Sequence, residues 1–381
     1  MDVHGTCSDE FDKVGQAFSR NFEKGLELGA AVAVTVDGAP VVDLWAGDAD
    51  PRGNPWQEDT IVNVYSSTKT MAATCMLMLA DRGELDFDAP VAQYWPEFAQ
   101  NGKESVLVRH VMSHTSGVSG YDPPVTVEQI YDLDGIAAHL AAQDLWWEPG
   151  TKSGYHALTQ GNLEGEILYR ITGKRMGQWF HDEVAGPTGA DFYMGLPASE
   201  DHRVAELIPP EVNPTAEPMI NGVPITMDMI AGKTLMSLTL TALEPQTREW
   251  RAAEIPAAGG IGNARSMARI HSFLACGGEV DGLRLLSEAG VRKALEQQID
   301  NVDEVLMAHL RHGIGFGLAL QDWVEPKNDS SMFWGGWGGS IALIDIENRV
   351  SIAYVMNRME TEITGDPRAA RIVHAVYESL G

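Results

Sequence analysis

A serine and a lysine three residues apart, Ser66 and Lys69, are the side chains whose types and spacing could do chemistry. They open an apolar run that predicts a helix over 66–82, so both should project from one helix face. In such an S-x-x-K pair the serine is a nucleophile and the lysine its base. Free N–H groups of the first turn and the positive helix end would favour a developing oxyanion. Lys69 can act as a base only if desolvation and nearby positive charge lower its pKa.

Two further segments could complete such a site. Tyr155 follows a loop containing Pro149 and Gly150 and precedes an expected helix, a place from which its hydroxyl could enter a cleft. Taken alone, it is more simply an ordinary half-buried tyrosine. The run F-W-G-G-W-G-G-S at 333–340 has glycines that allow close approach of a ligand and tryptophans that could form an apolar wall. Its simpler interpretation is a glycine-rich turn.

The elements that must position these residues follow from hydrophobic periodicity. Asp37-Gly38 between two β-rich runs predicts a hairpin. Because β-rich runs lie near both ends of the sequence, we expect one antiparallel sheet flanked by helices, with a helical middle inserted. The proline-containing stretch 205–225 predicts a loop or lid. Helices are expected at 9–28, 66–82, 89–96, 106–113, 127–143, 158–172, 264–276, 287–298 and 366–380, and later strands at 313–319, 340–345 and 350–355.

Composition excludes several classes of function. The 381 residues are 44% hydrophobic, which supports a substantial core. A formal net charge of −27 leaves no basic stripe for nucleic acid or for an anionic membrane. The first residues lack the pattern of a signal peptide, and no apolar run is long enough to span a bilayer. Three distant cysteines, Cys7, Cys75 and Cys276, predict a reduced, cytoplasmic protein.

Other candidate motifs are weaker. His110 and His114 stand four residues apart and could share a metal, but no third ligand is near them. The glycines at 313, 315 and 317 lack the spacing of a dinucleotide-binding motif. No G-x-S-x-G motif occurs. We therefore expect neither a metal nor a cofactor. His156, beside Tyr155, could tune the site and contact substrate, or it could face away.

The S-x-x-K pair, Tyr155 and the glycine-rich run stand in the order and at roughly the distances found in the penicilloyl serine transferases. The chain resembles a class C β-lactamase-type protein, and most closely the family VIII carboxylesterases. Nearly the whole chain takes part, including L-D-F-D-A-P-V at 85–91, R-H-V-M-S-H-T-S-G at 109–117, A-E-I-P-A-A-G-G at 253–260 and Y-V-M-N-R-M at 354–359.

This resemblance implies an α/β (α+β) fold in a single β-lactamase-like unit over 1–381. Residues 1–82 and 255–381 would form an α/β subdomain with an antiparallel sheet. Residues 83–254 would form an inserted all-helical domain, with the lid near 205–225. The cleft between the two would hold the site.

The resemblance also implies roles for individual residues. Ser66 would be the nucleophile, Lys69 the base, and Tyr155 the tyrosine of the Y-x-N motif. The backbone N–H groups of Ser66 and Trp337 would form the oxyanion hole. Substrate contacts would come from the W-G-G form of the K-T-G motif, Trp334, Gly335 and Gly336, and from His156.

Two departures favour an uncharged ester over a β-lactam or a peptide. Ala157 stands where lactamases and peptidases carry asparagine, and Trp334 stands where a lysine would hold a substrate carboxylate. We therefore predict a serine esterase that hydrolyses small uncharged carboxylic esters through an acyl-enzyme, without a cofactor. Its partner is a small-molecule ester, with no nucleic acid and no membrane. The alternatives are an acyltransferase of the same fold, a β-lactamase or D-amino peptidase, and a catalytically silent binding protein; a homo-oligomer is left open.

Overall fold

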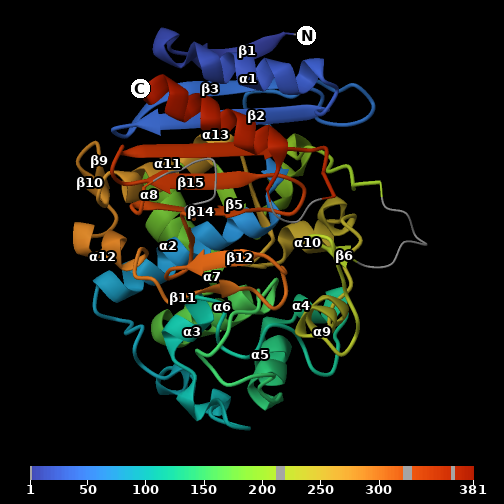
Figure 1. Ribbon diagram of the computed structural model, residues 1–381, viewed down its shortest axis with the longest axis vertical. Coiled ribbons are helices and arrows are strands. Elements are labelled where there is room, and N and C mark those ends of the chain that lie inside the picture. The colour runs from blue at the N-terminus through green and yellow to red at the C-terminus, as the bar shows by residue number, and fades with distance from the viewer. Residues whose placement is uncertain (1, 212–218, 321–327, 362–364) are drawn as a thin grey trace.

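The computed structural model describes residues 2–211, 219–320, 328–361 and 365–381, and a large antiparallel sheet runs through its upper half (Figure 1). The sheet has nine strands in the order β1-β3-β2-β16-β15-β14-β13-β12-β11. The order joins the first hairpin to the last strand, which confirms one antiparallel sheet built from both ends of the sequence. Its strands are β1 Val3–Cys7, β2 Gly29–Val36, β3 Ala39–Gly47, β11 Ile299–Val302, β12 His309–His312, β13 Gly317–Leu318, β14 Ser331–Gly335, β15 Ile341–Asp345 and β16 Val350–Met356.

Helices cover both faces of this sheet (Figure 1). α1 (Asp12–Glu23) and α13 (Pro367–Leu380) pack together on one face, whereas α11 (Ala264–Ala275) packs against β2, β15 and β16 on the other. The predicted hairpin is confirmed, because β2 and β3 are joined through Asp37 (φ 50°) and Gly38 (φ 80°). Asp-Gly suits this turn because both of its central residues need a positive φ.

The lower half of the molecule is mainly helical, as expected for the inserted region (Figure 1). The helices of the inserted region are α3 Val108–Met112, α4 Val127–Ile130, α5 Leu133–Ala142, α6 Thr159–Thr172, α7 Met176–Phe180, α8 Gly186–Thr188, α9 Ile230–Met236 and α10 Arg248–Ala252. The helix expected at 127–143 is two helices, since Asp132 accepts a hydrogen bond from the Gly135 N–H and caps a new start.

The inserted region is not all-helical, so that part of the prediction is wrong. β5 (Phe192–Met194) pairs with β8 (Gly260–Gly262), which also pairs with β4 (Val62–Asn63) just before Ser66. A short hairpin, β6 Met219–Ile220 and β7 Val223–Pro224, lies within the range expected to be a loop. Because β5 joins the strands that flank the nucleophile, the two halves share a small sheet as well as an interface.

Hydrophobic periodicity did not predict several other strands and turns. β1 and β11 contain only exposed and half-buried residues, so neither shows an apolar periodicity. The helix expected at 287–298 is α12 (Glu288–Lys293), after which the chain enters β11. Residues 89–96 form 3-10 turns, and another short hairpin, β9 Glu279–Val280 with β10 Leu283–Arg284, lies at the edge of the molecule.

α2 (Thr68–Asp81) is the central helix, and it is buried from Thr68 to Leu79. It packs against α6, α7, α12 and β14, so elements from both halves surround it. One cluster of hydrophobic side chains continues through both halves. In the described parts of the chain, no helix has the length and apolar character that crossing a membrane requires.

The close approach of α6 to residues 256–257 gives a test of this packing. A methyl group on Gly161 would lie 2.3 Å from the Ala257 nitrogen, so Gly161→Ala should lower the free energy of unfolding by ~1–3 kcal/mol. Gly165 is one turn further along the same helix, and its added methyl would meet only Pro256 Cγ, at 3.6 Å. Gly165→Ala should therefore be neutral or stabilising, because alanine is the better helix former. Urea denaturation of both variants decides; an equal loss for both would contradict the steric account.

Candidate active site

The serine of the S-x-x-K pair lies in a 3-10 turn, Tyr65–Ser67, immediately before α2. The helix was expected to begin at Ser66, but it begins at Thr68. Tyr65 has a φ of 43°, an uncommon backbone conformation for a residue with a side chain. Two contacts hold this sharp turn. The Thr68 hydroxyl donates to the Tyr65 carbonyl (2.5 Å) and accepts from the Gly260 N–H of β8 (2.8 Å). The turn presents Ser66 to the cavity described below.

Lys69 lies in the first turn of α2 with its amine held among three oxygens. Nζ is 3.3 Å from Ser66 Oγ, and it donates to the carbonyls of Ala157 (2.7 Å) and Ala257 (3.0 Å). An uncharged amine has two N–H bonds and one lone pair. Donation to two carbonyls therefore leaves the lone pair directed at the Ser66 hydroxyl. This is the arrangement that a general base requires.

Burial favours the uncharged state of Lys69. Its side chain is 2% exposed, and desolvation lowers the pKa of the amine to about 7. The nearby Glu164 carboxylate would raise that pKa, but burial also raises the pKa of Glu164, to about 8. Glu164 is thus largely protonated at neutral pH and does little to hold Lys69 in its charged form.

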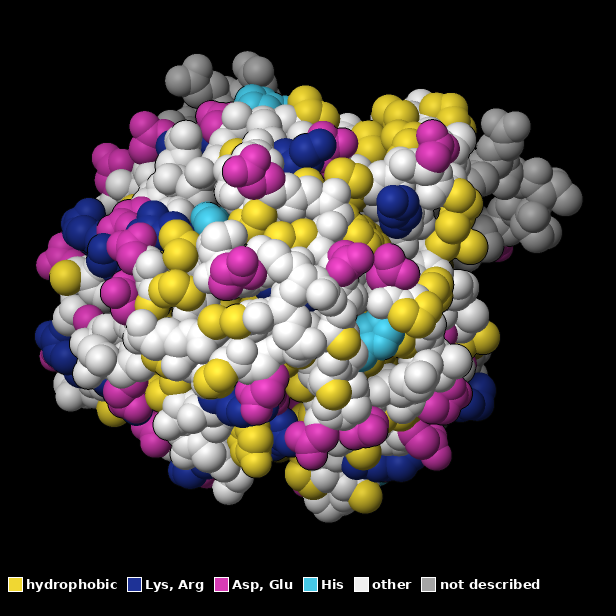
Figure 2. Space-filling view, turned by 90° about the horizontal axis from the view of Figure 1, so that it is seen from below, with side chains coloured by type: hydrophobic (Ala, Val, Ile, Leu, Met, Phe, Trp, Pro, Cys, Tyr) yellow, Lys and Arg dark blue, Asp and Glu magenta, His cyan; other side chains and the backbone are white. Residues whose placement is uncertain are grey.

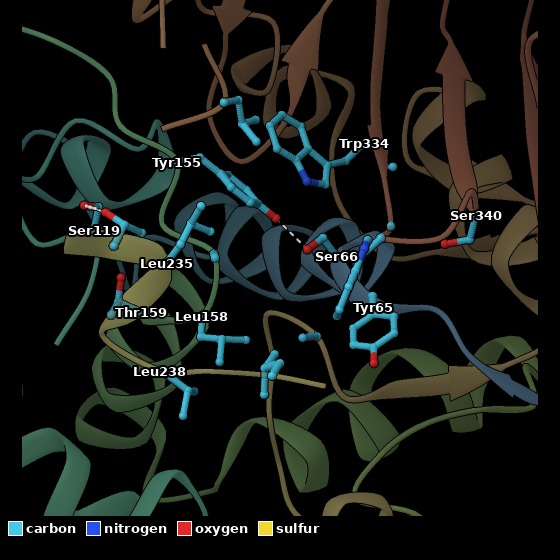
Figure 3. Close-up of a pocket in the computed structure, with 18 of the residues that line it drawn as sticks. Tyr65, Ser66, Ser119, Tyr155, Leu158, Thr159, Leu235, Leu238, Trp334 and Ser340 are labelled. Atoms are coloured by element: carbon cyan, nitrogen blue, oxygen red, sulfur yellow. Dashed lines mark hydrogen bonds between the residues drawn. The ribbon is translucent and has the colours of Figure 1, made fainter. Parts of the chain in front are cut away.

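The hydroxyl group of Tyr155 points toward Ser66 (Figure 3). Its hydroxyl lies 2.5 Å from Ser66 Oγ, and Lys69 Nζ lies 4.8 Å above its ring. Burial raises the pKa of Tyr155 to about 12, so it is a protonated phenol at neutral pH and can donate a proton. Its backbone N–H donates to Asp303 Oδ1 (3.0 Å), which fixes the tyrosine at the start of its segment.

The glycine-rich run brings the end of β14 against the nucleophile turn. A methyl group on Gly336 would lie 2.1 Å from the Val64 carbonyl oxygen, so no larger residue fits there. The Ser340 hydroxyl donates to the same Val64 carbonyl (2.8 Å) and lies 2.9 Å from Ser67 Oγ. Within the described residues, no hydrogen bond uses the backbone N–H of Ser66 or of Trp337. Both N–H groups are therefore free to bind an oxyanion.

A cavity of about 450 Å³ adjoins these residues. Trp334, Gly335, Gly336 and Trp337 all line it, as the sequence predicts. The Trp334 ring lies 5.5 Å from that of Tyr155 and packs between it and His312. No lysine, arginine or histidine occurs among the described lining residues. The apolar part of the wall comes mainly from Leu158, Leu235, Leu238, Leu306, Leu310 and Ile341.

The wall facing the solvent differs from the expected lid. Of the described part of 205–225, only Pro210 lines the cavity; residues 212–218 lie outside the described residues. Residues 234–240, in and after α9, line it instead. Thr234 Oγ1 lies 2.6 Å from Ser119 Oγ, which ties this wall to the helical half (Figure 3). Hydrophobic side chains gather at the surface over the β6–β7 hairpin and α9 (Figure 2), where Met227 and Met236 are more than half exposed.

His156 is the predicted site residue that the structure does not bring to the cavity. Its side chain is fully buried and does not line the cavity. Nε2 lies 2.6 Å from Ser116 Oγ, and Nδ1 lies 2.6 Å from the Gly154 carbonyl oxygen. Burial lowers the pKa of His156 to about 4, so the ring stays neutral. Adjacent side chains in an extended segment point in opposite directions. Because the Tyr155 side chain points toward Ser66, the His156 side chain points away from it, into the protein interior.

No group of three metal-ligating side chains occurs in the described ranges. The His110–His114 pair has structural contacts instead. His110 Nδ1 accepts from the Leu107 N–H (3.1 Å), and His114 Nδ1 accepts from the His156 N–H (3.1 Å).

Three residues of the site were missed from sequence. Asp303 fixes the Tyr155 backbone, Glu164 lies near Lys69, and the Ala257 carbonyl binds Lys69 Nζ. Two are acids in a chain that carries 54 acidic residues, and the third acts through its backbone, so no local pattern marks them. The segment 253–260 was noticed only through the family resemblance.

Comparisons with known proteins agree with this geometry. Residues 18–377 match the beta-lactamase family. An esterase/beta-lactamase, LipL of Mycobacterium tuberculosis, is 36% identical over 369 residues, which cover 94% of this chain and 83% of that protein. The crystal structure of a family VIII carboxylesterase is 41% identical with a TM-score of 0.92, and covers 100% of both chains. A penicillin-binding protein homologue from Caulobacter crescentus is 38% identical with a TM-score of 0.91, also over 100% of both.

The match to the beta-lactamase family thus covers nearly the full length of the chain. It includes the segments that carry Ser66, Lys69, Tyr155 and the two free N–H groups. The protein belongs to the beta-lactamase family.

Proposed function

We propose that this protein is a serine carboxylesterase that hydrolyses small, uncharged esters through an acyl-enzyme. One observation carries the proposal. Ser66 is contacted by both a buried amine, whose pKa desolvation lowers to about 7, and a buried phenol, and it opens on a mainly apolar cavity without a cationic side chain among its described lining residues. Activation of the serine accounts for acyl transfer. Apart from Asp366 the described lining residues carry no ionisable acid or base that is charged at neutral pH, and none is cationic, which accounts for an ester without a carboxylate, since a buried anion needs a partner.

The reaction follows from the positions of the protons. Ser66 Oγ gives its proton to Lys69 Nζ and bonds to the ester carbonyl carbon. The carbonyl oxygen becomes negative and accepts from the N–H groups of Ser66 and Trp337. The C–O bond to the alcohol then breaks. Tyr155 donates a proton to the departing oxygen, and the Lys69 ammonium restores it.

Hydrolysis of the acyl-enzyme reverses these roles. A water molecule gives a proton to the Tyr155 and Lys69 pair and attacks the acyl carbon. When the bond to Ser66 Oγ breaks, the pair returns a proton to that oxygen. The net products are a carboxylic acid and an alcohol. Because Lys69 Nζ lies 4.8 Å from the centre of the Tyr155 ring and both groups contact Ser66 Oγ, these groups should titrate as a pair.

A cytoplasmic location is part of this proposal. Cys7, Cys75 and Cys276 are free thiols, as is usual for proteins kept in a reducing compartment.

The first prediction concerns the nucleophile. Ser66→Ala should lower kcat for p-nitrophenyl butyrate by about a thousandfold or more, because the bond to the acyl group cannot form. A fluorophosphonate probe should label the native protein at Ser66 and leave the variant unlabelled. Ser67→Ala is the matched control, because the adjacent hydroxyl is buried against Ser340 and should be needed for packing alone. Retention of more than about a hundredth of the native activity by Ser66→Ala would contradict the assignment.

The second prediction concerns the base. Since only neutral Lys69 accepts a proton, kcat/KM should rise with pH through an apparent pKa near the value of about 7 expected for Lys69, and then reach a plateau. Lys69→Arg keeps the positive charge but cannot release its proton, so activity should nearly disappear. Near-native rates for the arginine variant would make Lys69 an electrostatic support, and the proton would then have to go to Tyr155.

The third prediction concerns substrate preference. With no cationic side chain among the described lining residues and Trp334 in place of a lysine, p-nitrophenyl butyrate should have a higher kcat/KM than nitrocefin. The measurement compares both substrates on one enzyme preparation, with Ser66→Ala as the blank. A higher kcat/KM for nitrocefin would favour the β-lactamase alternative over the esterase.

A further inference from the structure

The backbone turn that carries the Trp337 N–H is part of a tight four-residue loop. The Gly339 N–H donates to the Gly336 carbonyl (3.1 Å), and Gly338 has a φ of 97°. A closed turn with a positive φ at its third residue is of type II, and glycine adopts that φ readily. The peptide group between Gly336 and Trp337 belongs to the turn. Any rotation of the turn therefore changes the direction in which the Trp337 N–H points.

A buried arginine, which does not itself line the cavity, holds this turn. Arg368, near the start of α13, is fully buried, and its Nη2 donates to the Gly338 carbonyl (2.7 Å). A methyl group on Gly339 would lie 2.1 Å from Asp366 Oδ2 and 2.6 Å from Arg368 Nη2. The turn and the arginine are thus in direct contact.

The guanidinium group of Arg368 joins segments that are far apart in the chain. An arginine has five N–H bonds in a planar fork, and here every nitrogen of the fork has partners. Besides Gly338, the partners are Asp366 Oδ1 on Nε (3.1 Å), Asp366 Oδ2 on Nη2 (2.6 Å), and on Nη1 the Arg358 carbonyl (2.8 Å), Glu27 Oε2 (3.1 Å) and the Leu26 carbonyl (3.2 Å).

Apolar contacts also attach α13 to the protein. Ile372, Val373 and Val376 are buried, and burial of their apolar surface favours docking of the helix. A buried charge network adds little net stability compared with apolar packing of the same volume. What the network does provide is a fixed geometry, and the turn next to Trp337 is one of the elements that it fixes.

We propose that Arg368 is a positioning residue for ester hydrolysis: through the Gly338 carbonyl it holds the turn that aims the Trp337 N–H at the substrate oxyanion. This inference rests on the proposed esterase function. Oxyanion stabilisation depends on donors that are already oriented when the charge develops. Loosening the turn therefore weakens binding of the transition state while binding of the neutral ester changes little. The expected signature is a fall in kcat with a nearly unchanged KM.

The network also offers a matched control. The Tyr354 hydroxyl donates to Glu27 Oε1, on the side of the network away from Gly338. Tyr354→Phe removes this hydrogen bond but leaves the contact between Arg368 and Gly338. A role limited to stability would make Tyr354→Phe and the arginine variant alike in kinetics. A positioning role separates them.

The experiment measures kcat and KM for p-nitrophenyl butyrate well below the unfolding temperature of each variant, together with inhibition by an arylboronic acid. The boronate forms a tetrahedral adduct with the serine and places an oxygen in the oxyanion hole. Arg368→Lys should lower kcat by about ten- to a hundredfold, since a lysine cannot reproduce the fork. Its KM should stay within about threefold, and its boronate Ki should rise in parallel with the loss of kcat/KM. Tyr354→Phe should lower the unfolding temperature but keep kcat within about twofold.

If Arg368→Lys does not fold, Asp366→Asn decides, because it keeps the shape and weakens the clamp on Nη2; it should lower kcat several-fold at unchanged KM. Equal kcat values for the native protein and the tested variant would overturn the positioning role while leaving the esterase proposal intact. A parallel fall in kcat for Tyr354→Phe would also overturn it, in favour of a purely structural role. A native protein that neither hydrolyses the ester nor reacts at Ser66 with the fluorophosphonate would overturn the esterase proposal and this inference with it.

Discussion

The removal of Lys69 from water is the constraint on which the rest of the site depends. An amine in water is charged at neutral pH and has no lone pair to offer. Here α2 is buried on all sides, and the carbonyls of Ala157 and Ala257 take the place of solvent around Nζ. These carbonyls come from opposite halves of the chain, so the base exists only when both halves are packed together. The fold therefore supplies chemistry that the lysine alone lacks.

The close approach of Gly336 to the backbone before Ser66 is a second constraint on the site. The end of β14 can lie against Val64 only because Gly336 has no side chain. Ser340 then fastens the start of β15 to the nucleophile turn through the same carbonyl. β14 packs against the turn Tyr65–Ser67, and the absence of a side chain at Gly336 lets the segments that carry the Ser66 and Trp337 N–H groups lie close together. A site with two backbone donors is thus a consequence of this packing and of one small residue.

Selectivity arises from what the cavity wall lacks as well as from what it contains. The Trp334 ring packs against Tyr155 and His312, so an apolar side chain takes the place of a cation at this point. The segment 234–240 adds leucines on the solvent side. Both features favour neutral acyl and alcohol groups. The segment 234–240 is held by a hydroxyl pair, Ser119 and Thr234, so this part of the wall adds no charge to the cavity.

The sequence by itself determined the chemistry and most of the scaffold. The Ser66 and Lys69 spacing, the Asp37-Gly38 turn and the apolar run of α2 depend on neighbours a few residues away, so local periodicity predicts them. The polar edge strands β1 and β11, and the strand β5 within the inserted region, were missed because short, half-exposed strands are defined by their partners. Tertiary structure alone decided that His156 turns inward, that residues 234–240 form the outer wall, and that Asp303, Glu164 and Arg368 act on the site. The physical reason is that burial and hydrogen-bond partners come from segments far apart in the chain, and no local pattern records which acid or which carbonyl the fold will place beside a given side chain.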